Sequence, residues 1–196
     1  MDAYQFYTET FHLTDPVLIN TMVKNSEKRH YRKGDLIVHI GEIQKEICFM
    51  ESGVFRGYMM DYHGNEMTDC FGNRRGEIAG CMFFGPVAQG LVSSVAFEML
   101  VEGDFFCVPI TAILGFLDKS MEAMAIYNQI INNGARKHWD LKRIMVCCSA
   151  MQRYQWFLEE YPGLADCINI KYIASFLGMK PETLSRIRKT LADDVH

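Results

Sequence analysis

The chain has 196 residues, of which 49% are hydrophobic and 22% are charged, and its formal net charge is −4. This length and composition are typical of one large folded domain or two smaller ones, and they exclude the disordered, collagen-like and low-complexity classes. No stretch of eighteen apolar residues without a charge is present, and residues 1–14 lack the basic start and apolar run of a signal peptide. We therefore expect a cytoplasmic protein without a membrane partner. The negative net charge, taken alone, argues against a nucleic-acid ligand.

The seven cysteines predict reduced thiols inside the protein. Their number is odd, and most of them lie in apolar runs such as residues 47–49 and 106–108. No Cys-x-x-Cys motif is present, and the first 47 residues contain no cysteine. A zinc ribbon or an N-terminal iron–sulfur cluster therefore lacks a ligand set, and we expect no metal site.

The first half of the chain predicts short helices followed by a β domain. Residues 1–26 are expected to form one or two short helices. Short apolar runs separated by glycine-containing turns then extend from His30 to Pro109, which is typical of strands in an antiparallel β-roll or jelly roll. The expected strands are residues 36–38, 47–50, 54–62, 66–71, 94–100 and 104–109.

From Thr111 onward the sequence is helical. Residues 120–148 contain no proline and a single glycine, Gly134, which predicts a helix of about 28 residues, roughly 40 Å long. Two interpretations of this helix stay open: it lies on the β domain, or it pairs with the same helix of a second copy, where Gly134 would allow close approach. A second helix over 149–161 ends at Pro162-Gly163. The apolar row of the long helix comprises Tyr127, Ile130, Gly134, Leu141, Ile144 and Cys148.

The end of the chain predicts a helix-turn-helix. Ala174 is small where two helices would cross, and Gly178 can adopt the left-handed conformation that the turn requires. Pro181 suits the first position of the second helix, where its missing N–H costs nothing. The stripe that the second helix would bury comprises Leu184, Ile187 and Leu191.

The opposite face of the second helix has the side chains of a recognition helix, which presents donors, acceptors and cations to the major groove. Residues 168–191 hold five basic residues and one acidic residue, a net charge of +4, so the other residues carry −8. The alternative is a solvated polar face on a small helical domain. The candidate DNA-binding residues are Lys171, Lys180, Glu182, Thr183, Ser185, Arg186 and Lys189.

Several segments carry a resemblance to a known family. Residues 151–162 and 173–188 resemble the C-terminal part of the Crp/Fnr family of bacterial transcription regulators, in its short-chain form. Residues 31–35, 49–58 and 61–66 are similar to the cyclic-nucleotide-binding β-roll of the same family. The resemblance covers nearly the whole chain, and the C-terminal motif is its most specific part.

This resemblance implies an α+β fold with a β-roll sensor domain (1–110), a long dimerisation helix (111–148) and a helix-turn-helix DNA-binding domain (149–196). It implies a non-enzymatic transcription regulator that forms a homodimer, binds a two-fold DNA operator and responds to an effector. RNA polymerase is a further partner that it implies. Glu182 and Arg186 match the positions at which family members read bases and phosphates.

Two features depart from the family pattern at the C-terminus. Pro181 stands where the cyclic-AMP-type members have a base-reading arginine, which predicts a different operator sequence. Five residues follow Leu191, too few for the β-hairpin wing that usually comes after the recognition helix. We therefore expect DNA contacts without a wing, and a correspondingly greater dependence on dimerisation.

The effector site departs from the family as well. Members that bind a cyclic nucleotide place a glutamate after a glycine, and further along an Arg-Ser pair for the cyclic phosphate. Here Gly80 is followed by Cys81, and residues 76–119 contain no arginine. Because a buried phosphate without a cationic partner is costly, we expect no response to cyclic AMP. The candidate effector pocket, which either holds a more apolar effector or is closed core, comprises Gly80, Cys81, Phe83, Phe84, Ser93 and Ser94, flanked by Phe97 and Met99.

Other classes of function remain as alternatives. The first is a dimeric ligand-sensing or partner-binding β-roll module that does not bind DNA. A cupin-type metal enzyme needs clustered imidazoles, whereas His30, His39 and His63 of the β domain form no His-x-His pair. A serine hydrolase is not supported, because no G-x-S-x-G motif is present. Haem binding through His39, His63 or His138 stays open, but no cofactor is predicted and the effector is unidentified.

Overall fold

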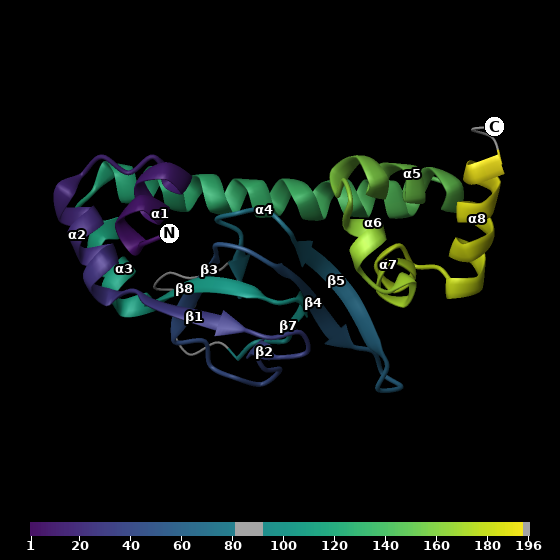
Figure 1. Ribbon diagram of the computed structural model, residues 1–196, viewed down its shortest axis with the longest axis horizontal. Coiled ribbons are helices and arrows are strands. Elements are labelled where there is room, and N and C mark those ends of the chain that lie inside the picture. The colour runs from purple at the N-terminus through teal and green to yellow at the C-terminus, as the bar shows by residue number, and fades with distance from the viewer. Residues whose placement is uncertain (81–91, 194–196) are drawn as a thin grey trace. The chain divides into compact units, whose positions relative to one another are not determined.

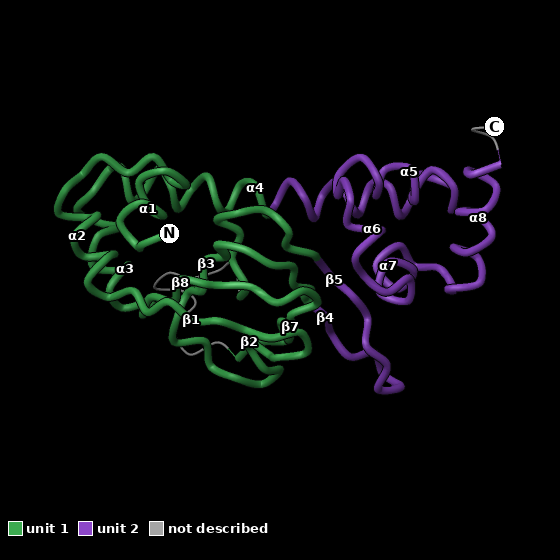
Figure 2. Tube along the Cα trace, in the orientation of Figure 1, with its two compact units in different colours: residues 1–57, 71–134 green, residues 58–70, 135–196 purple. Residues whose placement is uncertain are grey.

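The structure, a computed structural model, describes residues 1–80 and 92–193. It contains two compact units, shown in Figure 2. Unit 1 consists of residues 1–57 and 71–134, and unit 2 consists of residues 58–70 and 135–196. Within the described residues, no helix is both long enough and apolar enough to cross a membrane.

Unit 1 begins with helices and continues as a β-roll (Figure 1). Its two N-terminal helices start at aspartate caps: the side chain of Asp2 accepts a hydrogen bond from Gln5 N, and that of Asp15 accepts from Val17 N. The elements are α1 (Ala3–Phe11), α2 (Pro16–Asn25), β1 (Glu27–Tyr31), β2 (Leu36–Val38), β3 (Glu46–Met50), β4 (Val54–Met60), β5 (Glu66–Gly72), β6 (Ile78–Ala79), β7 (Ala96–Val101), β8 (Gly103–Pro109), α3 (Ile110–Leu117) and α4 (Met121–Cys147). Of these, β4, β5 and α4 extend into unit 2.

The strands form two four-stranded sheets, in the orders β1-β8-β3-β6 and β2-β7-β4-β5. Strand β8 pairs antiparallel with β1 on one side and with β3 on the other. These sheets confirm the predicted antiparallel β-roll. Strand β1 was not predicted, because its sequence, Glu-Lys-Arg-His-Tyr, contains no apolar run.

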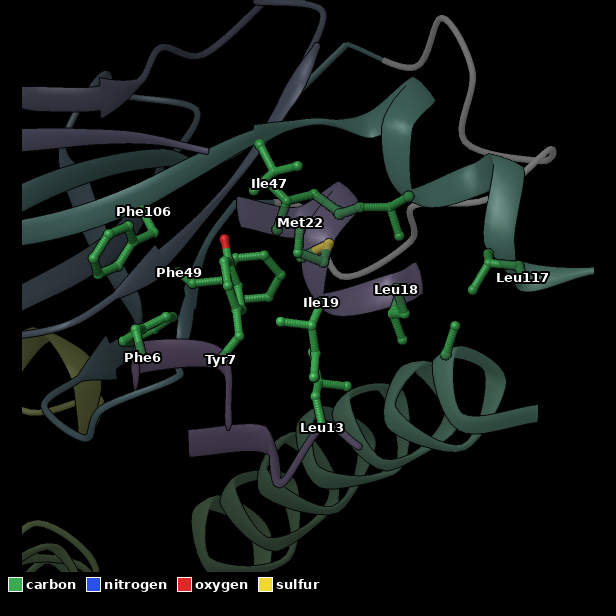
Figure 3. Packing of buried hydrophobic residues seen from close by; sticks show 13 residues of the cluster. Phe6, Tyr7, Leu13, Leu18, Ile19, Met22, Ile47, Phe49, Phe106 and Leu117 are labelled. Carbon is green, nitrogen blue, oxygen red and sulfur yellow. The ribbon is translucent and has the colours of Figure 1, made fainter. Parts of the chain in front are cut away.

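The main core of unit 1 lies between the first sheet and helices α1 to α3. Because side chains alternate along a strand, Phe106 and Val108 of β8 and Ile47 and Phe49 of β3 all face the helices. Phe6 of α1 is fully buried, and its ring packs 4.6 Å from that of Phe106 (Figure 3). This packing holds the N-terminal helices on the outer face of the sheet.

A second layer of side chains fills the interior between the two sheets. The ring of Phe55 on β4 lies 5.9 Å from that of Phe97 on β7 and 6.0 Å from that of Phe105 on β8. Position 72 of β5 accommodates only glycine, because a Cβ there would overlap the ring of Phe55. Because Phe105 packs on Phe55 in this layer and side chains alternate along a strand, the odd-numbered residues of β8 face the inside of the roll.

Helix α4 packs against its own chain along the apolar row identified in the sequence. Tyr127 and Ile130 contact the core of unit 1, and Ile144 is 2% exposed within unit 2. At the start of α4, the Glu122 carboxylate accepts hydrogen bonds from the backbone N–H groups of Thr14 (2.7 Å) and Asp15 (2.8 Å). Tyr127, Ile130 and Ile144, for which the sequence also allowed a role in a dimer interface, thus pack within the chain.

Unit 2 combines the C-terminal helices with residues 58–70, the tip of the β4–β5 hairpin. The three-part domain division expected from the sequence stays a prediction, and the two compact units divide the chain differently, at Gly134 within α4. The remaining helices are α5 (Ala150–Glu160), α6 (Leu164–Cys167), α7 (Ile170–Phe176) and α8 (Pro181–Asp193).

Candidate nucleic-acid interface

A tight turn at Gly178 joins α7 to α8. Gly178 has φ 60°, and its N–H donates to Ser175 O at 3.1 Å, while Met179 N–H donates to Ala174 O at 2.9 Å. This pair of bonds is the Schellman arrangement that ends a helix with a left-handed residue. A Cβ at Gly178 would also overlap the Cε of Met145. The left-handed conformation therefore favours glycine here, and a larger residue would also require the Met145 side chain to move.

Arg153 of α5 stabilises the same turn. Its Nη1 donates to the carbonyl oxygen of Leu177 at 2.8 Å, in the last turn of α7, where carbonyl groups lack partners within the helix. A cation at this end also interacts favourably with the helix dipole. This role is not evident from the sequence, because neither the spacing nor the composition around Arg153 indicates which distant carbonyl group it reaches.

The core of unit 2 determines which side of α8 faces outward. Ile173 and Ala174 of α7 are fully buried, as is Leu184 of α8, and Ile187 is 8% exposed. The ring of Phe157 on α5 lies 6.0 Å from that of Phe176 on α7. The predicted buried stripe of α8 is thus present at Leu184 and Ile187, and Leu191 is half-buried.

The predicted DNA-binding side chains lie on the surface of unit 2. All are exposed except Thr183, which is half-buried. Glu182 lies in the first turn of α8, where the helix dipole favours a negative charge. Lys171 is the second residue of α7; its backbone N–H donates to Oδ1 of the cap Asn169, and its Nζ lies 4.8 Å from the centre of the Tyr172 ring. Helix α8 itself presents Glu182, Ser185, Arg186 and Lys189 on the side opposite its buried residues.

Ser175 of α7 connects the helix-turn-helix to the β4–β5 hairpin within unit 2. Its Oγ accepts a hydrogen bond from Thr68 N at 2.9 Å and donates to Glu66 O at 3.4 Å. Strand β5 is an edge strand, so its outer backbone groups need partners other than a neighbouring strand. No sequence pattern indicates this contact, since the partners are separated by more than a hundred residues.

The candidate effector residues lie in unit 1, and only some of them are described. Cys81, Phe83 and Phe84 fall outside the described residues. Ser93 is 7% exposed, and its hydroxyl donates to the carbonyl oxygen of Val95 at 2.6 Å, whereas Ser94 is exposed. Gly80, with φ 153°, leaves no room for a Cβ beside the Gln44 amide, and Phe97 and Met99 belong to the buried core.

A buried ion pair lies on the second sheet. Arg56 of β4 is 2% exposed, and its Nε and Nη2 lie 2.7 and 2.6 Å from a single carboxylate oxygen of Glu98 on β7. A buried charge of this kind is strongly destabilising when its partner is removed. The arginine is therefore committed to a partner within the protein.

The sequence matches no protein-family model and no curated protein. Its fold, however, matches solved structures. FixK2 from Bradyrhizobium japonicum aligns with a TM-score of 0.75 at 19% identity, over 86% of this chain and 85% of that chain. A Eubacterium rectale protein assigned to the Crp/Fnr family of transcriptional regulators aligns with a TM-score of 0.73 at 16% identity, over 97% and 88%. This chain has the Crp/Fnr fold.

A third Crp/Fnr-fold structure is the c-di-GMP-responsive regulator CLP from Xanthomonas campestris. It aligns with a TM-score of 0.71 at 12% identity, over 92% of this chain and 93% of that chain. The aligned shares show that the likeness includes both the β-roll and the helical C-terminal part. The predicted fold class is thereby confirmed.

One histidine of the β-roll, His30, has a polar partner within the protein. His30 of β1 hydrogen-bonds through Nδ1 to Asp104 at 2.7 Å, and this bond, together with the charge of Lys28, holds the pKa of Asp104 below its usual value. Among the residues that the structure describes, no group of three or more His, Cys, Asp or Glu side chains could hold a metal ion.

Replacing Gly178 with alanine should destabilise unit 2 by about 1–2 kcal/mol, because an L-residue is strained in the left-handed conformation. Both tryptophans, Trp139 and Trp156, belong to unit 2, so urea unfolding followed by tryptophan fluorescence measures this change. Gly115→Ala in α3 is the control, since a Cβ there meets nothing within 4 Å. An unchanged transition in Gly178→Ala would contradict the assigned turn.

Proposed function

We propose that this protein is a homodimeric DNA-binding transcription regulator of the Crp/Fnr type that does not respond to cyclic AMP. The observation that carries the proposal is the outward face of α8, which presents Arg186 and Lys189 opposite the buried Leu184 and Ile187. The Crp/Fnr fold supports it. RNA polymerase, as a further partner, belongs to the same proposal.

The charge on this face suits a polyanionic partner. The segment 168–191 carries +4 within a chain of net charge −4, so the positive charge is concentrated on the helix-turn-helix. Phosphate contacts by lysine and arginine supply sequence-independent affinity, and base contacts by side chains such as Arg186 supply specificity. The negative total charge of the chain is therefore compatible with DNA binding.

A row on α4 supports the homodimer. Its positions are separated alternately by four and three residues, the spacing at which two helices pair in a left-handed coiled coil, and every one of them is exposed. Met121, Trp139 and Val146 are 92%, 67% and 77% exposed, so apolar side chains recur along this row, and grouped exposed apolar side chains mark an interaction surface. The row comprises Met121, Ala125, Asn128, Asn132, Ala135, Trp139, Lys142 and Val146.

We infer that the protein does not respond to cyclic AMP because the candidate effector residues include no arginine to pair with the cyclic phosphate. Residues 76–119 contain no arginine, and the buried Arg56 is held by Glu98. A cyclic phosphate would have to displace this carboxylate or be buried without a cation, and either change is costly.

Arg186→Ala should weaken binding to the preferred duplex by about 1–3 kcal/mol if the side chain reads a base. Fluorescence anisotropy with a labelled duplex, enriched from random sequences by the wild-type protein, measures the loss. Arg32→Ala removes an exposed arginine of the β-roll and should leave binding unchanged. Equal affinities of the wild-type protein and Arg186→Ala would refute the assigned role.

Trp139→Glu should convert the dimer to a monomer, because it places two like charges across the paired helices. Sedimentation velocity measures the mass of the species, and Tyr4→Glu, at a residue 55% exposed on α1, is the matched control. A wild-type protein that sediments as a monomer, or a variant that remains dimeric, would argue against pairing through this row.

Millimolar cyclic AMP should leave the melting temperature unchanged, because a ligand stabilises a protein only when it binds the folded state. Differential scanning calorimetry of the full chain makes the measurement. A clear upward shift in the presence of cyclic AMP, absent with 5′-AMP at the same concentration, would overturn this part of the proposal.

A further inference from the structure

Two cysteines lie directly opposite each other inside the β-roll. Cys48 on β3 and Cys107 on β8 are register partners in the antiparallel pair. Opposed residues in such a pair have Cα atoms about 4.5 or 5.5 Å apart, and both values lie within the range of a disulfide. Both cysteines are free thiols and both are buried, at 5% and 1% exposure.

An ion pair crosses the strand at the position of Cys107. Arg29 on β1 is opposite Phe105, and Glu46 on β3 is opposite Pro109. The Arg29 guanidinium reaches Glu46 at 2.6 Å, so it passes over β8 between these two positions, where Cys107 lies. The Tyr31 hydroxyl is 3.9 Å from the Cys107 sulfur.

These neighbours make the two thiols chemically unequal. The hydrogen bond from Cys48 lowers the pKa of Cys107 against the effect of burial, and the charge of Arg29 and the Tyr31 hydroxyl lower it further. The same hydrogen bond and burial raise the pKa of Cys48. Of the two thiols, Cys107 is therefore the more readily ionised. A nearby cation and a second thiol are two features of reactive cysteines, and here the cation, Arg29, also pairs with the carboxylates of Glu27 and Glu46, the second of which raises the pKa of Cys107.

We propose that Cys48 and Cys107 form a reversible redox pair that hydrogen peroxide converts to a disulfide. The Cys107 thiolate attacks one peroxide oxygen: an S–O bond forms, the O–O bond breaks, and the departing hydroxide takes a proton from solvent. The Cys48 thiol then loses its proton and attacks the Cys107 sulfur. The S–S bond forms, the S–O bond breaks, and water leaves.

Because Cys48 and Cys107 are buried, only a small oxidant can reach their sulfur atoms. The side chains that cover the thiols, Arg29 and Glu46, are 31% and 36% exposed, so the pair lies close beneath the surface. Hydrogen peroxide is small enough to pass such side chains, whereas a bulky disulfide such as oxidised glutathione is not. Cys147 on α4 is exposed and has no register partner, and it provides an internal comparison.

The test is a thiol map of the full-length reduced protein after treatment with hydrogen peroxide. Remaining thiols are blocked with N-ethylmaleimide, and the protein is digested after glutamate. Cys48 then lies in residues 47–51, Cys107 in residues 103–122 and Cys81 in residues 78–98, so mass spectrometry distinguishes every pairing of the three. We expect residues 47–51 to be linked to residues 103–122, with a loss of two hydrogen atoms that dithiothreitol reverses.

Variants separate the chemistry from simple proximity. Cys48→Ser should abolish the bridge and leave a sulfenic acid on Cys107, which dimedone traps, whereas Cys147→Ser should keep the bridge. Arg29→Gln should slow bridge formation severalfold, with circular dichroism as the check on folding. The proposal is overturned if Cys48 and Cys107 remain alkylated in the wild-type protein while Cys147 is oxidised, or if either cysteine bridges to a third.

Discussion

The burial of Leu184 and Ile187 beneath α8 is the contact on which the functional account depends. It determines which side of α8 is exposed. The left-handed Gly178, one residue after the C-cap Leu177 of α7, allows the chain to turn into α8. Arg153 completes the turn by satisfying the carbonyl group of Leu177. The exposed charges of α8 are therefore held by a defined core rather than by local helix preference alone.

Strand β8 plays a comparable part in unit 1. Residues 105–108 are all buried, two facing the helices and two facing the interior of the roll. Its pairing with β1 and β3 places Phe106 in the core with Phe6, and it brings Cys107 beside Cys48 and under Arg29. One strand thus positions both the main core and the thiol pair.

The sequence predicted the parts of this molecule that depend on local pattern. The turn at Gly178, the stripe of α8 and most strands follow from spacing within a few residues, and the Crp/Fnr resemblance supplied the architecture. The parts that depend on distant contacts were missed: strand β1, whose polar sequence becomes a strand by pairing with β8, and the bond between Ser175 and Thr68. The apolar row of α4 showed the same limit, because periodicity does not distinguish packing against the chain's own core from packing against a second copy. The contacts of Tyr127 and Ile130 with the core of unit 1 and the burial of Ile144 show that this row packs against its own chain.

The most direct test of the central claim is selection of bound fragments from random duplex DNA by the wild-type protein. A two-fold regulator predicts an enriched palindrome whose half-sites lie about one helical turn apart, roughly 10 base pairs, or a multiple of it. Enrichment should be lost in Arg186→Ala and kept in Arg32→Ala. Recovery of fragments without a shared sequence would contradict specific operator binding and favour a β-roll module that acts without DNA.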